Sequence, residues 1–436
     1  MKGSQHEVEF EKIVPEGQAL GRMDGKVVFA WGALPGERAR IRVTKKKRTV
    51  NFAEVLEILE PSPERQTPHE AHHLSCSPFQ IMDYERETEL KRELLRETMA
   101  EKAGEPLEPD AYHPADEILG YRNKLEFSFT DPDEAEVSPL QLAFFKRGTP
   151  FVKIPAPDGC VLGGEPMNRV AVEVARRLHE AGADAAALKT LIVRESKTTG
   201  EVLAGLFWRD REAAARTELD LEGIPGLAGH RIVYSRPNSP ASTYDEVLAS
   251  AGTDELEEAV EGMRIRYSFE SFFQNHLGLF PEALRAIREA CPPGGKFVEL
   301  YCGVGTIGLN VADRAHRLVG VEEVEPAIGL FHDNARANGV TNVEGRVSRA
   351  EKIDYALLED TDVLLLDPPR AGLHPKVVKR ILRTEPRRIV YLSCNPKTQA
   401  QDYAALKERY RLREFRAFDF YPRTPRLETF MVLDPR

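Results

Sequence analysis

From residue 280 to its end, the chain alternates short apolar runs with amphipathic segments. The apolar runs predict strands at 297–301, 318–322, 363–367, 389–393, 415–420 and 429–433. The amphipathic segments predict helices at 281–290, 326–337, 375–382 and 399–408. Short apolar strands separated by helices are typical of a parallel sheet that carries helices on both faces.

A cysteine stands at the end of the strand expected at 389–393. Residues 390–398 read VYLSCNPKT, so a buried strand delivers Cys394 to a turn, and Pro396 keeps that turn from continuing the strand. A lone cysteine at a strand end is the geometry expected of a nucleophile presented to a cleft. The alternative is a structural role, because free cysteine is among the most buried residue types.

A glycine-bearing turn follows the strand at 297–301. Residues 299–308 read ELYCGVGTIG, and Gly303, Gly305 and Gly308 match the spacing G-x-G-x-x-G. Glycines let the backbone approach a ligand closely, and a helix N-terminus supplies free N–H donors. Glu322, one strand later, is suited to bind two ribose hydroxyls. These residues predict adenosine binding and leave both NAD and S-adenosylmethionine open.

The sequence Asp367-Pro368-Pro369-Arg370 follows the strand at 363–367. A carboxylate followed by two prolines makes a rigid rim at the sheet edge where ligands bind. Such a rim can position a flat substrate beside a cofactor. A proline-stiffened loop without a functional role is the alternative.

The first 60 residues predict a small β module with strands at 7–13, 26–31, 38–44 and 53–59, separated by turn signals. Arg38, Arg40 and Arg42 share one face of the third strand, which runs into Lys45-Lys46-Lys47-Arg48. We expect an OB-like barrel with a phosphate-contacting face. A solvated edge strand protected by its charges is the alternative.

The middle of the chain predicts a polar linker followed by an α+β domain without a nucleotide motif. A strongly helical segment spans 84–102, and a second helix is expected at 167–181 between β-rich stretches. The linker at 61–77 contains His69, His72, His73 and Cys76. Such residues can bind metal, but their spacing matches no strong zinc pattern, so an ordinary linker is favoured over a metal site.

Length and composition limit the class of protein. A chain of 436 residues exceeds one ordinary core, so two or three domains are expected. No uncharged run approaches the ~20 residues of a membrane helix, and the first residues, MKGSQHEVEFEK, lack a secretory h-region. Five cysteines indicate a reducing, cytoplasmic location. The net charge of −10 argues mildly against a nucleic-acid partner, although the sign of a local patch matters more.

Several motifs together resemble the RNA uracil-5 methyltransferases, which use S-adenosylmethionine. They are SFFQNH (271–276), VELYCGVGTIGL (298–309), DPPRAGL (367–373) and SCNPKT (393–398). GYRNKLEFSF (120–129) resembles the middle domain of that family, and GRMDGKVVFAWGALPGE (21–37) resembles the TRAM domain of its 23S rRNA branch. The resemblance implies an α/β fold with a TRAM-like OB barrel at 1–60, a linker and α+β central domain at 61–270, and a Rossmann-like methyltransferase domain at 271–436.

The resemblance also implies roles for individual residues. Cys394 matches the nucleophile that adds to carbon 6 of uracil, and Glu428, in RLETF, matches the base that removes the proton from carbon 5. Phe272 or Phe273 is a candidate for stacking on the base, with buried core as the alternative. The positions that match cofactor-binding residues, of which Thr306 and Ser348 are the weaker matches, are Gln274, Tyr301, Gly303, Gly305, Thr306, Glu322, Ser348 and Asp367.

The chain departs from the family pattern at two places. Many members bind an iron–sulfur cluster through four cysteines, but here only Cys76 and Cys160 match, so we expect no cluster and no metal. The family's histidines before the glutamate appear as Arg423 and Arg426, which are suited to contact phosphate. A second-cysteine mechanism would need Cys302, which we instead expect to pack under the cofactor loop.

The expected function is therefore formation of 5-methyluridine in 23S rRNA, by a protein expected to be monomeric with RNA as its partner. A tRNA uracil methyltransferase is the alternative within this class. A non-catalytic RNA-binding or ribosome-assembly factor is the alternative from another class. The sequence leaves open which nucleotide is modified and whether one or two sites are targeted.

Overall fold

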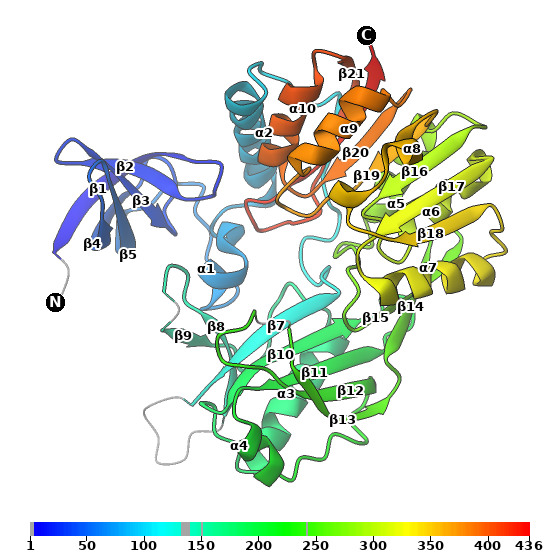
Figure 1. The fold of residues 1–436 in the computed structure, drawn as a ribbon. Coiled ribbons are helices and arrows are strands. Elements are labelled where there is room, and N and C mark those ends of the chain that lie inside the picture. The colour runs from blue at the N-terminus through cyan, green and yellow to red at the C-terminus, as the bar shows by residue number, and fades with distance from the viewer. Residues whose placement is uncertain (1–3, 132–139, 150, 241–242) are drawn as a thin grey trace.

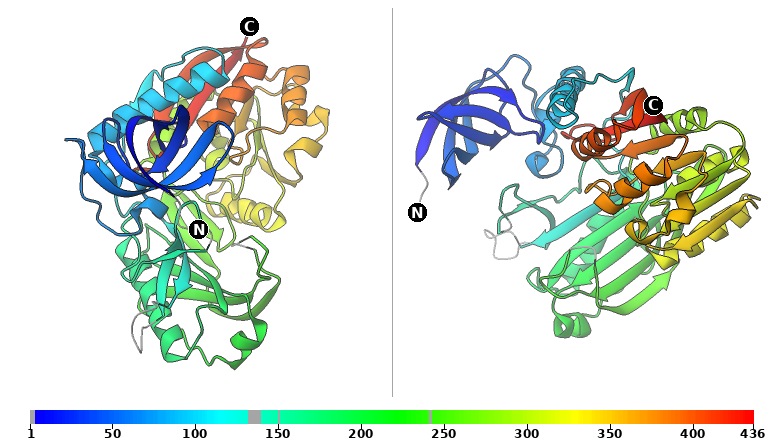
Figure 2. Two further views of the ribbon diagram at one scale, coloured as in Figure 1. Left: turned by 90° about the vertical axis from the view of Figure 1, so that its left-hand side faces the viewer. Right: turned by 45° about the horizontal axis from the view of Figure 1, so that its top comes forward.

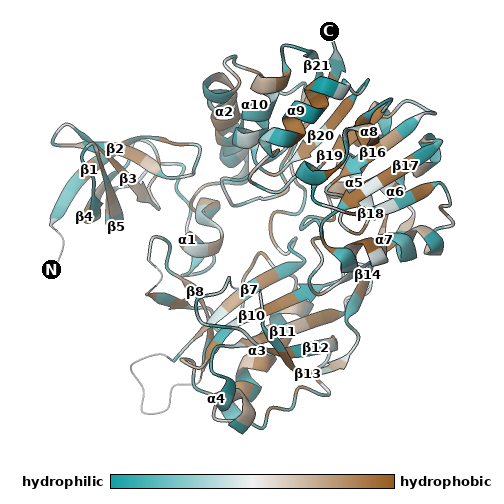
Figure 3. Ribbon diagram, viewed as in Figure 1, coloured by the Kyte–Doolittle hydropathy of each residue, from teal (hydrophilic) through white to brown (hydrophobic). Residues whose placement is uncertain are grey.

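The computed structural model describes residues 4–131, 140–149, 151–240 and 243–436, and it folds into an N-terminal barrel, a central sheet domain and a C-terminal α/β domain (Figure 1). Figure 1 and the right-hand view of Figure 2 show the barrel standing beside the other two parts. Apolar residues concentrate in the strands of both large sheets (Figure 3). In the described part of the chain, no helix is both long and apolar enough to cross a membrane.

The barrel is closed, with strand order β1-β2-β3-β5-β4 and pairing of β4 back to β1. Its strands are β1 (Gln5–Ile13), β2 (Ala19–Met23), β3 (Lys26–Trp31), β4 (Arg38–Lys46) and β5 (Val50–Glu60). Along β4, Ala39, Ile41 and Val43 point into the core while the arginines between them point outward, as the period of a strand requires. A closed five-stranded barrel confirms the expected OB-like module.

The edge-strand interpretation of β4 is wrong because the closed barrel leaves this strand paired on both sides. Its arginines are paired as well: Arg38 contacts Glu7 and Glu60, Arg40 contacts Glu57, and Arg42 contacts Glu54. Among the described residues, Lys45, Lys46 and Arg48 are exposed and make no ion pair. A cluster of free positive charge on the barrel therefore lies at and just beyond the end of β4.

A short segment connects the barrel to the rest of the chain and ends in a long helix. It contains α1 (His73–Cys76), a 3-10 turn at Pro78–Ile81, and α2 (Tyr84–Lys102), whose first turn is capped by the Asp83 carboxylate. Ile13 and Leu34 of the barrel pack with Phe79, Leu90 and Leu94 in one small apolar cluster. This cluster fixes the barrel to the helix.

The central domain is a seven-stranded sheet of order β13-β12-β11-β10-β7-β8-β9, in which β11 and β12 are parallel and the other described neighbours are antiparallel. Its strands are β7 (Lys124–Thr130), β8 (Gln141–Phe145), β9 (Lys153–Pro155), β10 (Leu188–Glu195), β11 (Val202–Trp208), β12 (Leu227–Tyr234) and β13 (Glu246–Gly252). The helices are α3 (Glu165–Glu180) and α4 (Arg211–Arg216). The apolar face of α3 packs on the sheet through residues such as Met167, Val170 and Val174.

The C-terminal domain is an eight-stranded sheet of order β18-β17-β16-β19-β20-β22-β21-β6. Its strands are β16 (Lys296–Leu300), β17 (Arg317–Glu322), β18 (Val343–Val347), β19 (Val363–Leu366), β20 (Ile389–Ser393), β21 (Tyr410–Phe418), β22 (Glu428–Pro435) and β6 (Ala111–His113). The helices are α5 (Phe280–Ala290), α6 (Thr306–Val311), α7 (Glu325–Ala337), α8 (Tyr355–Leu358), α9 (Pro375–Thr384) and α10 (Pro396–Leu406). The first five strands are parallel, and β22 lies antiparallel to β20 and β21.

Two separate apolar clusters cover the two faces of this sheet. Along β16, Phe297 faces one cluster while Val298 and Leu300 face the other. This arrangement confirms the expected α/β domain with helices on both faces. The carboxyl ends of the parallel strands therefore meet at one edge, where ligands bind in open α/β sheets.

Two elements of residues 61–270 pack with the C-terminal sheet instead of the central one. Leu95 and Met99 of α2 lie in the same apolar cluster as Val298, and α2 packs on α10. β6 pairs with β21 at the sheet edge. A third element, the hairpin of β14 (Glu255–Val260) and β15 (Met263–Ser268), contacts both β11 and α7.

Candidate active site

Cys394 lies where the buried strand β20 ends and α10 begins. The strand residues before it are all buried, and Pro396 starts the helix, so the thiol is carried on a turn at the carboxyl edge of the sheet. The half-buried Cys394 lines a cavity of about 760 Å³ between the barrel, the central domain and the C-terminal domain. The cationic side chains that line this cavity include Arg122, Lys124, Arg147, Arg370, Lys397 and Arg426.

Glu428 is the residue next to Cys394 across the strand pair. The register that pairs Ser393 with Thr429 makes Cys394 and Glu428 the next two residues beyond the ladder. Glu428 is fully buried, its Oε2 accepts a hydrogen bond from the Tyr421 hydroxyl at 3.4 Å, and its Oε1 has no partner among the described residues. Burial, with the Asp367 charge adding to it, raises the pKa of Glu428 well above its usual range.

A second carboxyl group, Asp367, follows β19 at the same edge. The Gln274 amide donates a hydrogen bond from Nε2 to Asp367 Oδ2 at 3.1 Å. Burial raises the pKa of Asp367 to about 7. Burial, and then the charges of Glu428 and Asp367, raise the pKa of Cys394 to about 11, while the Arg370 guanidinium acts in the opposite direction. The structure therefore brings one thiol and two carboxyl groups of raised proton affinity together.

The glycine-bearing turn lies after β16 at the neighbouring strand ends. Tyr301, Gly303 and Gly305 all have positive φ values, of 66°, 53° and 92°. A side chain at Gly303 would point into open space, whereas one at Gly305 would collide with Phe331. Left-handed backbone at a non-glycine residue such as Tyr301 is uncommon and clusters at functional sites. Thr306 begins α6 directly after this turn.

Glu322 is held at the end of β17 by backbone amides. Its Oε1 accepts from the N–H groups of Glu323 and Val324 at 2.8 and 3.0 Å, and its Oε2 accepts from Gly303 N–H at 3.2 Å. The Ser348 N–H donates to the Glu322 carbonyl oxygen at 2.8 Å. Gly303, Glu322 and Ser348 therefore form one group, in which a fixed carboxylate stands beside the glycine turn.

The structure distinguishes between neighbouring candidate residues for RNA contact that the sequence left open. Phe272 is 64% exposed, whereas Phe273 is buried and stacks on Tyr267 with ring centroids 4.3 Å apart. The phosphate-contact interpretation of Arg423 is wrong, because this residue is buried beside Glu87 at 3.6 Å. Arg426 instead lines the cavity.

The structure also shows the positions of side chains whose roles the sequence analysis predicted only in part or not at all. The sequence motif contained Arg370 without assigning it a role, and nothing in the sequence marked Tyr421 as a partner of Glu428. Cys302 is buried in the core under the turn, close to Gly320, as expected. In the linker, His72 and Cys76 meet Glu70 and Cys160, whereas His69 and His73 are not part of that group.

Comparisons with known proteins identify the family. The family model for tRNA (uracil-5-)-methyltransferases matches residues 253–436, and the TRAM domain model matches residues 1–56. An uncharacterized RNA methyltransferase of Porphyromonas gingivalis is 31% identical over 98% of this chain and 99% of its own length. The chain belongs to the RNA uracil-5 methyltransferase family. It is therefore an RNA methyltransferase that uses S-adenosylmethionine.

Two further similarities agree with this membership. An uncharacterized RNA methyltransferase of Caldanaerobacter subterraneus is 27% identical over 99% of both chains. Among solved structures, the Pyrococcus abyssi tRNA (uracil-54, C5)-methyltransferase in complex with S-adenosyl-L-homocysteine superposes with a TM-score of 0.76. That similarity covers 99% of this chain and 100% of the other at 24% identity, so it shows a shared fold along the whole length.

Proposed function

We propose that this enzyme methylates carbon 5 of a uridine in 23S rRNA, through a covalent adduct between Cys394 and carbon 6 of the base. The observation that carries the proposal is the placement of the Cys394 thiol. It opens onto a cation-lined cavity, with the buried Glu428 carboxyl beside it. RNA is a polyanion, so a pocket with this lining suits a nucleotide that is flipped out or already unpaired.

The chemistry of the base explains why a thiol is needed. Carbon 5 of uracil is a poor nucleophile until a thiolate adds to carbon 6, which pushes the electron pair of the 5,6 double bond toward the O4 enolate. Bound S-adenosylmethionine supplies an electrophilic methyl group for carbon 5. Because burial raises the pKa of Cys394 to about 11, the thiol must lose its proton before it adds, and the Arg370 guanidinium favours the thiolate.

Glu428 is proposed as the base that completes the reaction. Once carbon 5 carries both the methyl group and its hydrogen, removal of that proton re-forms the double bond and expels the Cys394 thiolate from carbon 6. Glu428 must be ionised when it takes this proton, and because of its raised pKa the carboxylate then binds the proton more tightly than an ordinary glutamate does. The unpartnered Glu428 Oε1 is the acceptor available for it.

The residues at the strand ends fit the cofactor. The fixed Glu322 carboxylate suits ribose hydroxyls, and the open space at Gly303 allows a ligand to approach the backbone. Gln274 presents a buried Oε1 that has no partner in the described part of the chain. We assign to cofactor binding Gln274, Tyr301, Gly303, Gly305, Thr306, Glu322, Ser348 and Asp367, the last with access to the uracil as well.

We also propose divisions of the chain near residues 60 and 270, with α2 and β6 as elements that join the C-terminal domain. Among the aromatic candidates, the exposure of Phe272 favours it over Phe273 for stacking on the base. The cytoplasmic location and the monomeric state stay predictions.

A tRNA substrate is the second candidate, and a specific observation favours it. The Pyrococcus abyssi tRNA methyltransferase is covered in full by this chain, so a barrel of this kind is compatible with a tRNA enzyme. The TRAM-like barrel, which is the reason for proposing 23S rRNA, therefore acts either as the recognition element for rRNA or as a general RNA-binding surface.

The test is to incubate the purified enzyme and S-adenosylmethionine with unmodified 23S rRNA and, separately, with unmodified bulk tRNA. Nucleoside mass spectrometry then maps each product. We expect 5-methyluridine at a defined position of the rRNA and none in tRNA. Methylation confined to tRNA would move the assignment to the second candidate, and failure to methylate either RNA would contradict both.

A further inference from the structure

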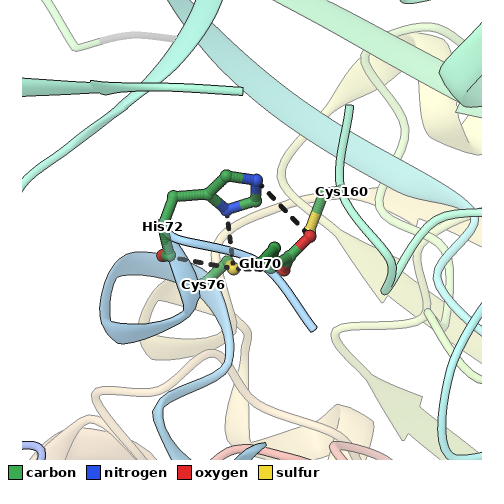
Figure 4. A group of neighbouring side chains, drawn as sticks. All are labelled: Glu70, His72, Cys76 and Cys160. Atoms are coloured by element: carbon green, nitrogen blue, oxygen red, sulfur yellow. Dashed lines mark hydrogen bonds and ion pairs between the residues drawn. The ribbon is translucent and has the colours of Figure 1, made fainter. Parts of the chain in front are cut away.

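Four side chains converge at the junction between the barrel linker and the central domain. Glu70, His72 and Cys76 come from the segment around α1, and Cys160 comes from the loop between β9 and α3 (Figure 4). One nitrogen, oxygen or sulfur atom from each residue lies within 4.8 Å of the corresponding atom of every other. His72 and Cys160 are buried, with 4% and 2% exposure, and Glu70 and Cys76 are partly buried. The four groups therefore point at one common centre.

Three of the six separations between the ligand atoms are close to those expected of a tetrahedron around one small cation. Zn²⁺ binds sulfur at about 2.3 Å and nitrogen or oxygen at about 2.0–2.2 Å, which places the ligand atoms of a tetrahedral site about 3.4–3.8 Å apart. Cys76 Sγ lies 3.4 Å from His72 Nδ1 and 3.1 Å from Glu70 Oε1. Cys160 Sγ lies 3.6 Å from the same Glu70 oxygen. These edges would need only small shifts to accommodate the ion.

Hydrogen bonds also hold the second polar atom of the His72 ring and of the Glu70 carboxyl group. His72 Nε2 lies 3.1 Å from the Gly159 carbonyl oxygen and 3.4 Å from Glu70 Oε2, so its N–H can donate to these oxygens and leave Nδ1 free as a ligand. Glu70 Oε2 accepts a hydrogen bond from the Val161 N–H at 2.9 Å, while Oε1 faces the two thiols and also accepts from Gln80 Nε2 at 3.2 Å. Metal-binding histidines and carboxylates are usually oriented by such outer hydrogen bonds.

The ligand set distinguishes between kinds of metal site. An iron–sulfur cluster of four irons is normally held by four thiolates, and this group offers two. Two thiolates, one imidazole and one carboxylate are ligands that suit Zn²⁺ in a closed tetrahedral site. Glu70 was absent from the sequence expectation, which considered histidine and cysteine alone.

We propose that Glu70, His72, Cys76 and Cys160 bind one Zn²⁺ ion, which fixes the linker of the barrel to the central domain. The ion would join two chain segments that are about 85 residues apart in sequence. Arg147 of the central domain strengthens the same junction, because it donates to the carbonyl oxygens of Leu74 and Ser75 and lies over the Trp31 ring of the barrel at 4.2 Å.

The site bears on the proposed RNA cavity because Ser75 and Cys76 form part of the cavity wall. A bound ion would fix this part of the cavity wall. It would also fix the orientation of the barrel relative to the central domain. The zinc proposal itself rests on the four side chains and not on the identity of the RNA.

The test uses the full-length enzyme, purified without chelators and dialysed against Zn²⁺ and then against metal-free buffer. Elemental analysis should find one zinc per chain in the wild type and less than a tenth of that in Cys160→Ser. Cys291→Ser is the matched control, because it removes a buried cysteine at the end of α5 and should keep the full zinc content. Replacement of zinc by Co²⁺ should give the thiolate charge-transfer and intense d–d absorption of a tetrahedral site.

Glu70→Gln is the second variant, in case Cys160→Ser does not fold. It keeps the size of the side chain and should weaken zinc binding at least tenfold in competition with a chromophoric chelator. The proposal is overturned if the wild type retains no zinc, which would leave a hydrogen-bonded cluster. It is also overturned by iron with acid-labile sulfide, or by a disulfide between Cys76 and Cys160.

Discussion

At the scale of single residues, the site contains three neighbouring groups that all have raised pKa values. Cys394, Glu428 and Asp367 lie at one sheet edge, and burial is the largest cause of the raised pKa of each. Such shifts are typical of catalytic groups, although buried structural groups show them too. The roles of Cys394 and Glu428 can be tested separately because the two residues would act at different steps of the reaction.

Glu428→Gln should stop the reaction after methyl transfer. The amide has the same size as the carboxyl group but cannot accept the carbon 5 proton, so the methylated base stays bonded to Cys394. We expect turnover to fall by at least about a hundredfold and a protein–RNA complex that survives denaturing electrophoresis to accumulate. Normal turnover in this variant would remove Glu428 from the role of base.

At the scale of elements, the segment between β15 and α5 carries two adjacent phenylalanines with opposite environments. Phe272→Ala should raise the KM for RNA about fivefold to a hundredfold, as expected for loss of base stacking, with little change in Tm. Phe273→Ala should lower the free energy of unfolding by about 3–5 kcal/mol, because its ring is packed on Tyr267. Steady-state kinetics and thermal denaturation of both variants would measure these two effects. Equal increases in KM for the two variants would contradict the assignment of base stacking to Phe272.

Strand β16 carries a buried carboxyl group beneath the glycine turn. Burial, with the charges of Asp367 and Glu322 adding to it, raises the pKa of Glu299 to about 8. The folded protein then holds a proton that the unfolded chain releases, so the stability from this group is present at low pH and is lost as pH rises through about 8.

Glu299→Gln should therefore flatten the pH dependence of stability. In the wild type, Glu299 alone should lower the free energy of unfolding by about 1.4 kcal/mol per pH unit between pH 6 and 8. Urea denaturation at several pH values gives the difference in slope between variant and wild type. Parallel curves would show that Glu299 is ionised in the folded protein.

Elements with strong local patterns were predicted well, and those that depend on distant partners were not. Helix α2 was expected at 84–102 and has those bounds, because its apolar spacing and its Asp83 cap are local signals. Strand β6 has only three residues and exists through its pairing with β21, about 300 residues later. Strand β2 contains Gly21 and Arg22, and half-exposed β18 contains Gly345, so neither has a clear apolar pattern.

The same distinction holds within the candidate site. Motif spacing placed Cys394 and Glu322 at strand ends, and the fold brings those ends to one edge. The sequence could not show that Glu70 meets Cys160, or that Phe272 and Phe273 differ in exposure, because those facts depend on how the parts pack together.

At the scale of the whole molecule, the cavity lies where all three parts of the chain meet. The barrel contributes Glu16, the central domain contributes Lys124, and the C-terminal domain contributes Cys394. The formal charge of −10 therefore says little about RNA binding, because cationic side chains outnumber the acidic Glu16 and Glu126 in the lining of the cavity.

Lys124→Gln should weaken RNA binding severalfold and reduce the slope of log Kd against log salt by about 1. The side chain is half-buried at the cavity, and in the described part of the chain it has no ion-pair partner. Arg216→Gln, on α4 at the far end of the central domain, is the matched control and should leave both quantities unchanged (Figure 1). If Lys124→Gln left the slope of log Kd against log salt unchanged, the RNA would bind outside this cavity.

The covalent step can be observed with RNA in which 5-fluorouridine replaces uridine. Fluorine at carbon 5 cannot be removed as a proton, so after thiolate addition and methyl transfer the elimination is blocked and the adduct persists. Peptide mass spectrometry of the complex formed with S-adenosylmethionine should find a methylated fluorouridine on Cys394, and Cys394→Ala should form no complex. An adduct on Cys302, or active enzyme without any adduct, would contradict the proposed mechanism.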